Sequence, residues 1–141
     1  MDYTKKKDAT ISLKQAKLLY RLVRYFNVKT VLTNTPNDRF LKSCLNLSRS
    51  GIVISDVNHA LGFYNLLFFD RPVPKYLSLA LKHVHNNSIV VFNNIHSSKA
   101  TSKNWKYLKN NPKITVTIDM FYFGFVFIRK EQTKENFVIR C

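Results

Sequence analysis

The stretch SIVVFNNIHSSKATSKNWKYLKNNPKITVTIDMFYFGFVFIRKE, residues 88–131, decides the fold class of this chain. It opens on an apolar, β-branched run at Ser88–Phe92, which is typical of a central strand covered on both faces. Lys99–Asn110 follows as a helix, because Trp105 and Leu108 fall on one face of it. Strands that alternate with helices in this way indicate an α/β sheet.

Two long apolar runs close the stretch. Ile114–Phe121 and Phe123–Arg129 predict strands, and only Tyr122 separates them. Without a helix between them, the two runs form a hairpin or a bulged strand that adds antiparallel at one edge of the sheet. We predict that both lie side by side with Ser88–Phe92 as the best-formed part of the sheet. The spacing of Tyr and Phe is typical of strand cores rather than of exposed base-stacking platforms.

Helices and strands alternate upstream of this stretch as well. Residues 1–10 are polar and predict a disordered tail, and residues 11–141 predict a single α/β domain. The expected helices are Leu13–Phe26, Asp38–Leu47, Val57–Tyr64 and Lys75–His85, and the expected strands are Lys29–Leu32, Gly51–Ser55, Leu66–Phe69 and Phe137–Arg140.

The chain is strongly basic: 23 Lys and Arg against 8 Asp and Glu give a formal net charge of +15 over 141 residues. Lys14, Lys17, Arg21 and Arg24 share one face of the first helix and, with the basic face of Lys99–Asn110, are suited to nucleic acid. The alternative is an AT-rich genome that replaces Asp by Asn and Arg by Lys and leaves solvated basic faces. Both interpretations stay open.

Targeting features favour a cytoplasmic protein without a membrane partner. The apolar runs are shorter than the roughly 18 residues of a membrane span, and the polar N-terminus does not resemble a secretory signal. Two cysteines, Cys44 and Cys141, do not make a disulfide framework. The oligomeric state is not indicated by any pattern in the sequence.

From Ser88 onward the chain resembles bacterial class I S-adenosylmethionine-dependent methyltransferases. The family pattern runs, in order, Asp-Asp-Ile-His, a helix with Trp, Pro, Ile-Asp-Leu-Phe, Gly and Phe-Arg-Lys-Glu. The matching residues of this chain are, in the same order, Asn93-Asn-Ile-His96, Trp105, Pro112, Ile118-Asp-Met-Phe121, Gly124 and Phe127-Ile-Arg-Lys-Glu131. The resemblance implies a Rossmann-like methyltransferase sheet, mostly parallel with an antiparallel C-terminal strand. It also implies methyl transfer to an acceptor that the sequence does not identify.

The resemblance assigns the cofactor to the earlier part of the chain. Thr33 stands at the end of the first strand, where the family has an acidic residue. Thr35 and Arg39 stand where the family has glycine. Asp56 stands where the family's carboxylate holds the ribose hydroxyls. Glycine lets the backbone approach a ligand closely, and none lies before Gly51. We therefore expect S-adenosylmethionine to bind weakly or not at all.

The segment between Asp56 and Asp70 is short for this family. The resemblance places a helix, a strand and a further helix there, and even one parallel crossover needs about a dozen residues. The chain therefore resembles a methyltransferase that is missing part of its N-terminal half.

The remaining candidates follow strands, where ligands of open α/β sheets bind. His96 is the candidate general base, because imidazole titrates near neutrality. Some related O-methyltransferases hold magnesium at positions that match Asp70, Asn93 and Asn94, and Asp70 is the second candidate catalytic residue. One carboxylate holds a hard divalent cation weakly, so we assign no metal site.

Three functions are open at this point. They are an active methyltransferase, a non-catalytic descendant that keeps the fold, and a basic domain that binds nucleic acid. The missing glycines favour the second function over the first, and the charge alone supports the third.

Overall fold

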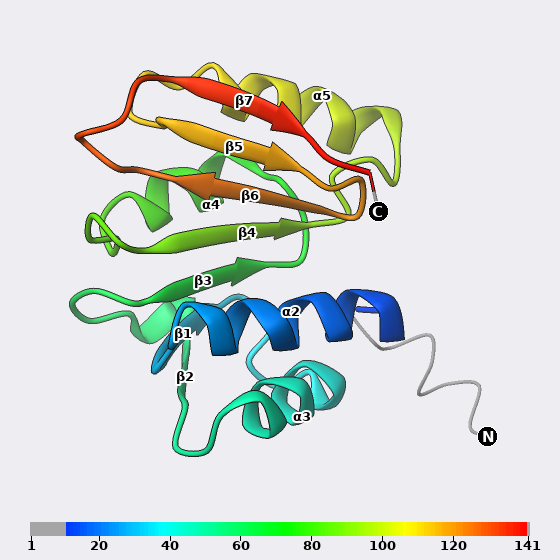
Figure 1. Ribbon diagram of the computed structural model, residues 1–141, viewed down its shortest axis with the longest axis vertical. Helices are drawn as coiled ribbons and strands as arrows, with labels where there is room; N and C mark the ends of the chain where they lie inside the picture. Colours follow the sequence, from blue (N-terminus) through cyan, green and yellow to red (C-terminus); the bar gives the residue numbers. More distant parts are fainter. Residues whose placement is uncertain (1–10, 141) are drawn as a thin grey trace.

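A computed structural model describes residues 11–140, so the tail predicted for residues 1–10 lies outside the described residues. One seven-stranded sheet in the order β2-β1-β3-β4-β6-β5-β7 forms its centre (Figure 1). The strands are β1 Thr30–Thr33, β2 Val53–Asp56, β3 Leu66–Phe69, β4 Ile89–Asn93, β5 Val116–Asp119, β6 Phe123–Phe127 and β7 Glu135–Val138. The helices are α2 Leu13–Tyr25, α3 Arg39–Ser48, α4 Pro74–Ala80 and α5 Lys99–Lys109, with a 3₁₀ turn, η1, at Val57–His59.

The sheet is mostly parallel. β1 pairs in parallel with β2 and β3, β3 with β4, and β5 with β7. β6 runs antiparallel to both β4 and β5. This confirms the mixed methyltransferase-like sheet and the predicted contact of the three strands from residues 88–131. The antiparallel strand lies inside the sheet rather than at its edge, because β5 and β7 are added beyond it.

Helices cover both faces of the sheet (Figure 1). Successive residues of β3 and β4 point to opposite faces, so each strand needs an apolar residue at every position. α2 and α3 pack on one face against Val31, Leu66, Phe68, Val91 and Phe125. α4 and α5 pack on the other face against Leu32, Leu67, Phe69, Phe92 and Val126.

α2, α3 and α5 begin at capping residues whose side chains accept hydrogen bonds from free backbone N–H groups. The Ser12 hydroxyl accepts a hydrogen bond from the Gln15 N–H at 3.2 Å, and Gln15 Oε1 accepts one from the Ser12 N–H at 2.7 Å. This reciprocal capping box fixes the start of α2. Asp38 caps α3 through a single hydrogen bond, which its Oδ1 accepts from the Leu41 N–H at 2.8 Å.

Several predicted elements are shorter than the sequence pattern indicates. The helix expected at Val57–Tyr64 is only the 3₁₀ turn η1, and α4 ends at Ala80 instead of His85. β5 ends at Asp119, because Phe121 has a φ of 70° and cannot continue a strand. The last strand begins at Glu135, ahead of the expected Phe137. None of the helices within residues 11–140 has the length and apolar character needed to cross a membrane.

Trp105 and Gly124, two residues of the pattern described above, are in direct contact in the fold. The side chain of Trp105 is 1% exposed and lies on β6 at Gly124. A Cβ atom at Gly124 would stand 2.5 Å from the nearest carbon of the Trp105 ring, closer than real Cβ contacts allow. The large indole therefore requires the small residue opposite it.

Candidate functional site at the carboxyl edge of the sheet

Polar side chains gather where the parallel strands end. Thr33, at the end of β1, is in register with Asp56 at the end of β2. β3 and β4 end at the same edge, at Phe69 and Asn93. This edge is where ligands of open α/β sheets bind, so the candidate site lies here.

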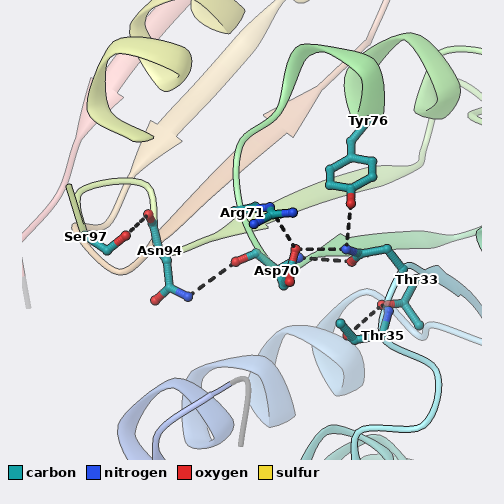
Figure 2. Close-up of polar contacts among 8 residues, drawn as sticks. Thr33, Thr35, Asp70, Arg71, Tyr76, Asn94 and Ser97 are labelled. Carbon is teal, nitrogen blue, oxygen red and sulfur yellow. Dashed lines mark hydrogen bonds and ion pairs between the residues drawn. The ribbon is translucent and has the colours of Figure 1, made fainter. Parts of the chain in front are cut away.

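Thr33 and Thr35 bond to each other. Thr33 is fully buried, and its Oγ1 accepts a hydrogen bond from the Thr35 N–H at 3.1 Å. The two hydroxyl oxygens lie 3.2 Å apart, and the two side chains face each other in Figure 2. This is the local turn that a Thr side chain makes with the backbone two residues on. Two of the three predicted cofactor residues therefore lie together, with their hydroxyls engaged in the turn.

Asn34 links the end of β1 to the loop after β3. Its Nδ2 donates to Asp70 Oδ1 at 2.8 Å and to the Tyr76 hydroxyl at 3.1 Å. Its Oδ1 accepts from the Asp70 N–H at 3.1 Å. Arg71 Nε lies 3.9 Å from the same Asp70 oxygen (Figure 2). The carboxylate of Asp70 is thus already bonded within the chain.

Asp56 caps the short connection that follows β2. Its Oδ1 accepts a hydrogen bond from the Asn58 N–H at 3.0 Å, at the start of η1. The Cα register with Thr33 places it at the strand end expected for a ribose-binding carboxylate. Its present hydrogen bond is that of a turn residue.

Two asparagines end β4 in different ways. Asn93 is fully buried, and its Oδ1 accepts hydrogen bonds from Gln15 Nε2 at 2.6 Å and from the Asn94 N–H at 2.9 Å. Asn94 has a φ of 57°, and its Nδ2 donates to the backbone oxygen of Asp70 at 3.3 Å. Within residues 11–140, no cluster of three or more His, Cys, Asp or Glu side chains could hold a metal ion.

His96 lies on the far side of β4 from Asp56, between α5 and the end of β5. Its Nε2 is 2.6 Å from Asp119 Oδ2, and its Nδ1 is 3.0 Å from Ser102 Oγ. Both ring nitrogens therefore have partners within the chain. The imidazole stacks at 5.7 Å, in a tilted arrangement, on the ring of Phe121.

Asp119 is a buried carboxylate with two cationic partners, His96 and Arg140. Its side chain is only 7% exposed, and that burial by itself raises the pKa of the carboxyl. Hydrogen bonds from His96 and the Phe121 N–H, with the positive charges of His96 and Arg140, outweigh it and hold the pKa below its ordinary value. Arg140 Nη1 lies 3.4 Å from Asp119 Oδ1.

The structure brings most of the predicted site residues to one edge but does not gather them all. Thr33, Thr35 and Asp70 surround Asn34, and Asp56 lies beside Thr33 in the sheet. His96 belongs to a separate cluster around Asp119. The sequence pattern assigned no role to Asn34 or Asp119; Asn34 could have been found as a polar residue directly after β1, whereas Asp119 is the last residue of β5.

The order of the strands, with the antiparallel β6 inserted between β4 and β5, is that of a methyltransferase-like α/β fold. The chain is similar to the SAH-bound Podospora anserina methyltransferase PaMTH1, with 11% identity, a TM-score of 0.68, and coverage of 86% of this chain and 81% of that one. It is also similar to the SAM-bound O-methyltransferase TomG from Streptomyces achromogenes, involved in tomaymycin synthesis, with 14% identity, a TM-score of 0.58 and coverage of 92% and 91%.

An O-methyltransferase from Bacillus cereus in complex with SAH gives a similar result. Its identity to this chain is 12% and its TM-score 0.58, with 84% of this chain and 82% of that chain covered. At these identities the likeness establishes the fold. No protein-family model and no curated protein matches the sequence.

Proposed function

We propose that this chain is a methyltransferase-like protein that keeps the fold of S-adenosylmethionine-dependent enzymes but has closed its methyl-donor site, and that it transfers no methyl group. The observation that carries the proposal is the amide of Asn34. It links the end of β1 to the loop after β3 through hydrogen bonds to Asp70 and Tyr76. A cofactor at this edge would have to displace these bonds.

Charge supports the same conclusion. The family's acidic residue at the end of the first strand is replaced by Thr33, whose hydroxyl is bonded to the Thr35 N–H. The ammonium group of S-adenosylmethionine therefore lacks a carboxylate partner there. One charge-assisted hydrogen bond stabilises a complex by roughly 1.5–3 kcal/mol, about ten- to a hundredfold in affinity.

An active methyltransferase on an unidentified acceptor is the competing function. In that case Asp56 would bind the ribose hydroxyls and His96 would be the general base, with Asp70 beside the acceptor. His96 would have to leave either Ser102 or Asp119 before it could take a proton, because both of its ring nitrogens have partners. This exchange opposes catalysis.

Calorimetry with the purified chain and S-adenosylmethionine tests the proposal. We expect no saturable heat at up to about 1 mM cofactor, and no rise in Tm, because a ligand that binds only the native state raises the Tm. The same measurement with Asp56→Ala and with the exposed charge control Glu135→Gln should give the same result.

Binding in the micromolar range that weakens in Asp56→Ala but not in Glu135→Gln would overturn the proposal. Such a result would restore the active enzyme, and transfer of a labelled methyl group to candidate acceptors would then be the next measurement.

A further inference from the structure

A groove separates α2 from the turn that joins β5 to β6. Its volume is about 340 Å³, near the lower end of small-molecule sites. No acidic side chain is among the described residues that line it. Its charged and aromatic lining consists of Lys14, Lys17 and Arg21 from α2, Arg140 after β7, and Phe121 and Tyr122 from the turn.

The two aromatic side chains are held by a turn that is fixed from several sides. The Phe121 N–H donates to Asp119 Oδ1 at 2.8 Å, and His96 in turn holds the other oxygen of Asp119 at 2.6 Å. The Tyr122 carbonyl accepts a hydrogen bond from the Asn94 N–H at 2.8 Å. These contacts keep Phe121 at a φ of 70°, which is unfavourable for an aromatic residue.

Exposed aromatic rings and positively charged side chains lie next to each other in this groove. Phe121 is 45% exposed and Tyr122 is 46% exposed, although the sequence pattern placed Phe121 in a strand core. The Lys14 ammonium lies 5.9 Å from the centre of the Tyr122 ring, and the Arg140 guanidinium lies 5.4 Å from that of Phe121. A ligand suited to the groove therefore combines a planar ring with negative charge.

The positive charge continues along α2 beyond the groove. Lys17, Arg21 and Arg24 are exposed and follow one another at helical spacing along a helix about 20 Å long. Arg24 and Arg49 then line a second hollow of about 400 Å³. A row of cations thus leads from the aromatic groove to a second basic hollow.

We propose that this surface binds single-stranded nucleic acid, with one base against Phe121 and Tyr122 and the phosphates along Lys17, Arg21 and Arg24. Exposed aromatic side chains stack unpaired bases regardless of sequence, and a cationic row follows the backbone. A duplex fits less well, because its bases are already paired and stacked. This site is independent of the methyl-donor site and does not require cofactor binding.

Filter binding of a labelled twelve-nucleotide oligothymidylate to the full chain at low salt tests the proposal. Tyr122→Ala should lower the affinity about tenfold, the effect of losing one stacked base. The double variant Lys17→Gln/Arg21→Gln should reduce the slope of log affinity against log salt by roughly 1.4, because two phosphate contacts are lost.

Matched controls lie on α5, on the opposite face of the sheet. Tyr107→Ala removes a ring that is 68% exposed, and Lys103→Gln/Lys106→Gln removes two exposed charges. We expect little change of affinity in Tyr107→Ala and a smaller loss of salt slope in the Lys103/Lys106 variant than in the α2 variant. Unchanged circular dichroism and Tm show that each variant is folded.

Three results would overturn the proposal. The first is no binding at low salt, which leaves composition bias as the account of the charge. The second is an equal effect of the α2 and α5 variants, which shows non-specific attraction. The third is thymidine monophosphate binding as tightly as the oligonucleotide, which shows a free-nucleotide site without a strand along α2.

Discussion

The two ends of the carboxyl edge differ in what their polar groups bond to. Between β1 and β3, Asn34 and Thr33 bond to neighbours in the chain. Beyond β4, the rings of Phe121 and Tyr122 stay about half exposed beside cationic side chains. The comparison teaches that one sheet edge can have its polar groups satisfied within the chain at one end and offer rings and charges to a ligand at the other.

Replacing Gly124 by Ala should have the largest effect on the free energy of unfolding, because it disturbs the packing of α5 on β6. The added Cβ would stand 2.5 Å from the buried Trp105 ring, and overpacking of this kind costs about 3 kcal/mol. Urea unfolding followed by circular dichroism measures the loss. Gly51→Ala is the control: it has a φ of 78° and open space, so only about 1 kcal/mol of backbone strain is expected.

A Trp105→Leu background should remove most of the extra cost of Gly124→Ala, since the clashing ring is gone. A cost that persists in this double variant, or one no larger than that of Gly51→Ala, would contradict the packing account.

Asp119→Asn should have the next largest effect, about 1.5–3 kcal/mol at pH 7, because charge-assisted hydrogen bonds are lost. The pKa of Asp119 is lowered in the folded chain, so its stabilisation is present above the unfolded pKa of about 4 and is lost as the pH falls. The difference in unfolding free energy between wild type and variant should therefore shrink below about pH 4. Glu135→Gln serves as the charge control, and a pH-independent difference would refute the assignment.

Asn34→Asp should lower the free energy of unfolding by a smaller amount, about 1–2 kcal/mol at pH 7. It tests the hydrogen bonds between the end of β1 and the loop after β3. It places a second carboxylate at the 2.8 Å contact with Asp70, where two negative charges repel. Acidification protonates one of them, so part of the loss in Tm should be recovered near pH 4. Asn87→Asp, in an exposed turn, should show neither the loss nor the recovery.

The sequence predicted the elements whose pattern is local. Leu66–Phe69 matches β3 at both ends, and the buried runs that became β4 and β6 were placed within a few residues. Turn geometry was not predictable, because the left-handed conformation of Phe121 depends on Asp119 and Asn94. The pattern therefore extended a strand through a residue that the turn exposes.

The candidate site was predictable only as a set of strand ends. Thr33, Asp56 and Asp70 lie at the edge where they were expected. Their partners could not be inferred, because Asn34 bonds to Asp70 and Tyr76, which are 36 and 42 residues away. The contact of Gln15 with Asn93 spans 78 residues, so no local pattern reports it.

The placement of Trp105 gives the molecule a built-in optical probe. It is the single tryptophan of the chain, and its ring is buried against β6. Indole emission shifts to longer wavelength when water reaches the ring, so this signal follows the packing of α5 on the sheet. Far-ultraviolet dichroism also follows α2 and α3, on the other face. Coincident curves would show one cooperative unit, and separate curves would show that the two faces of the sheet lose their packing at different denaturant concentrations.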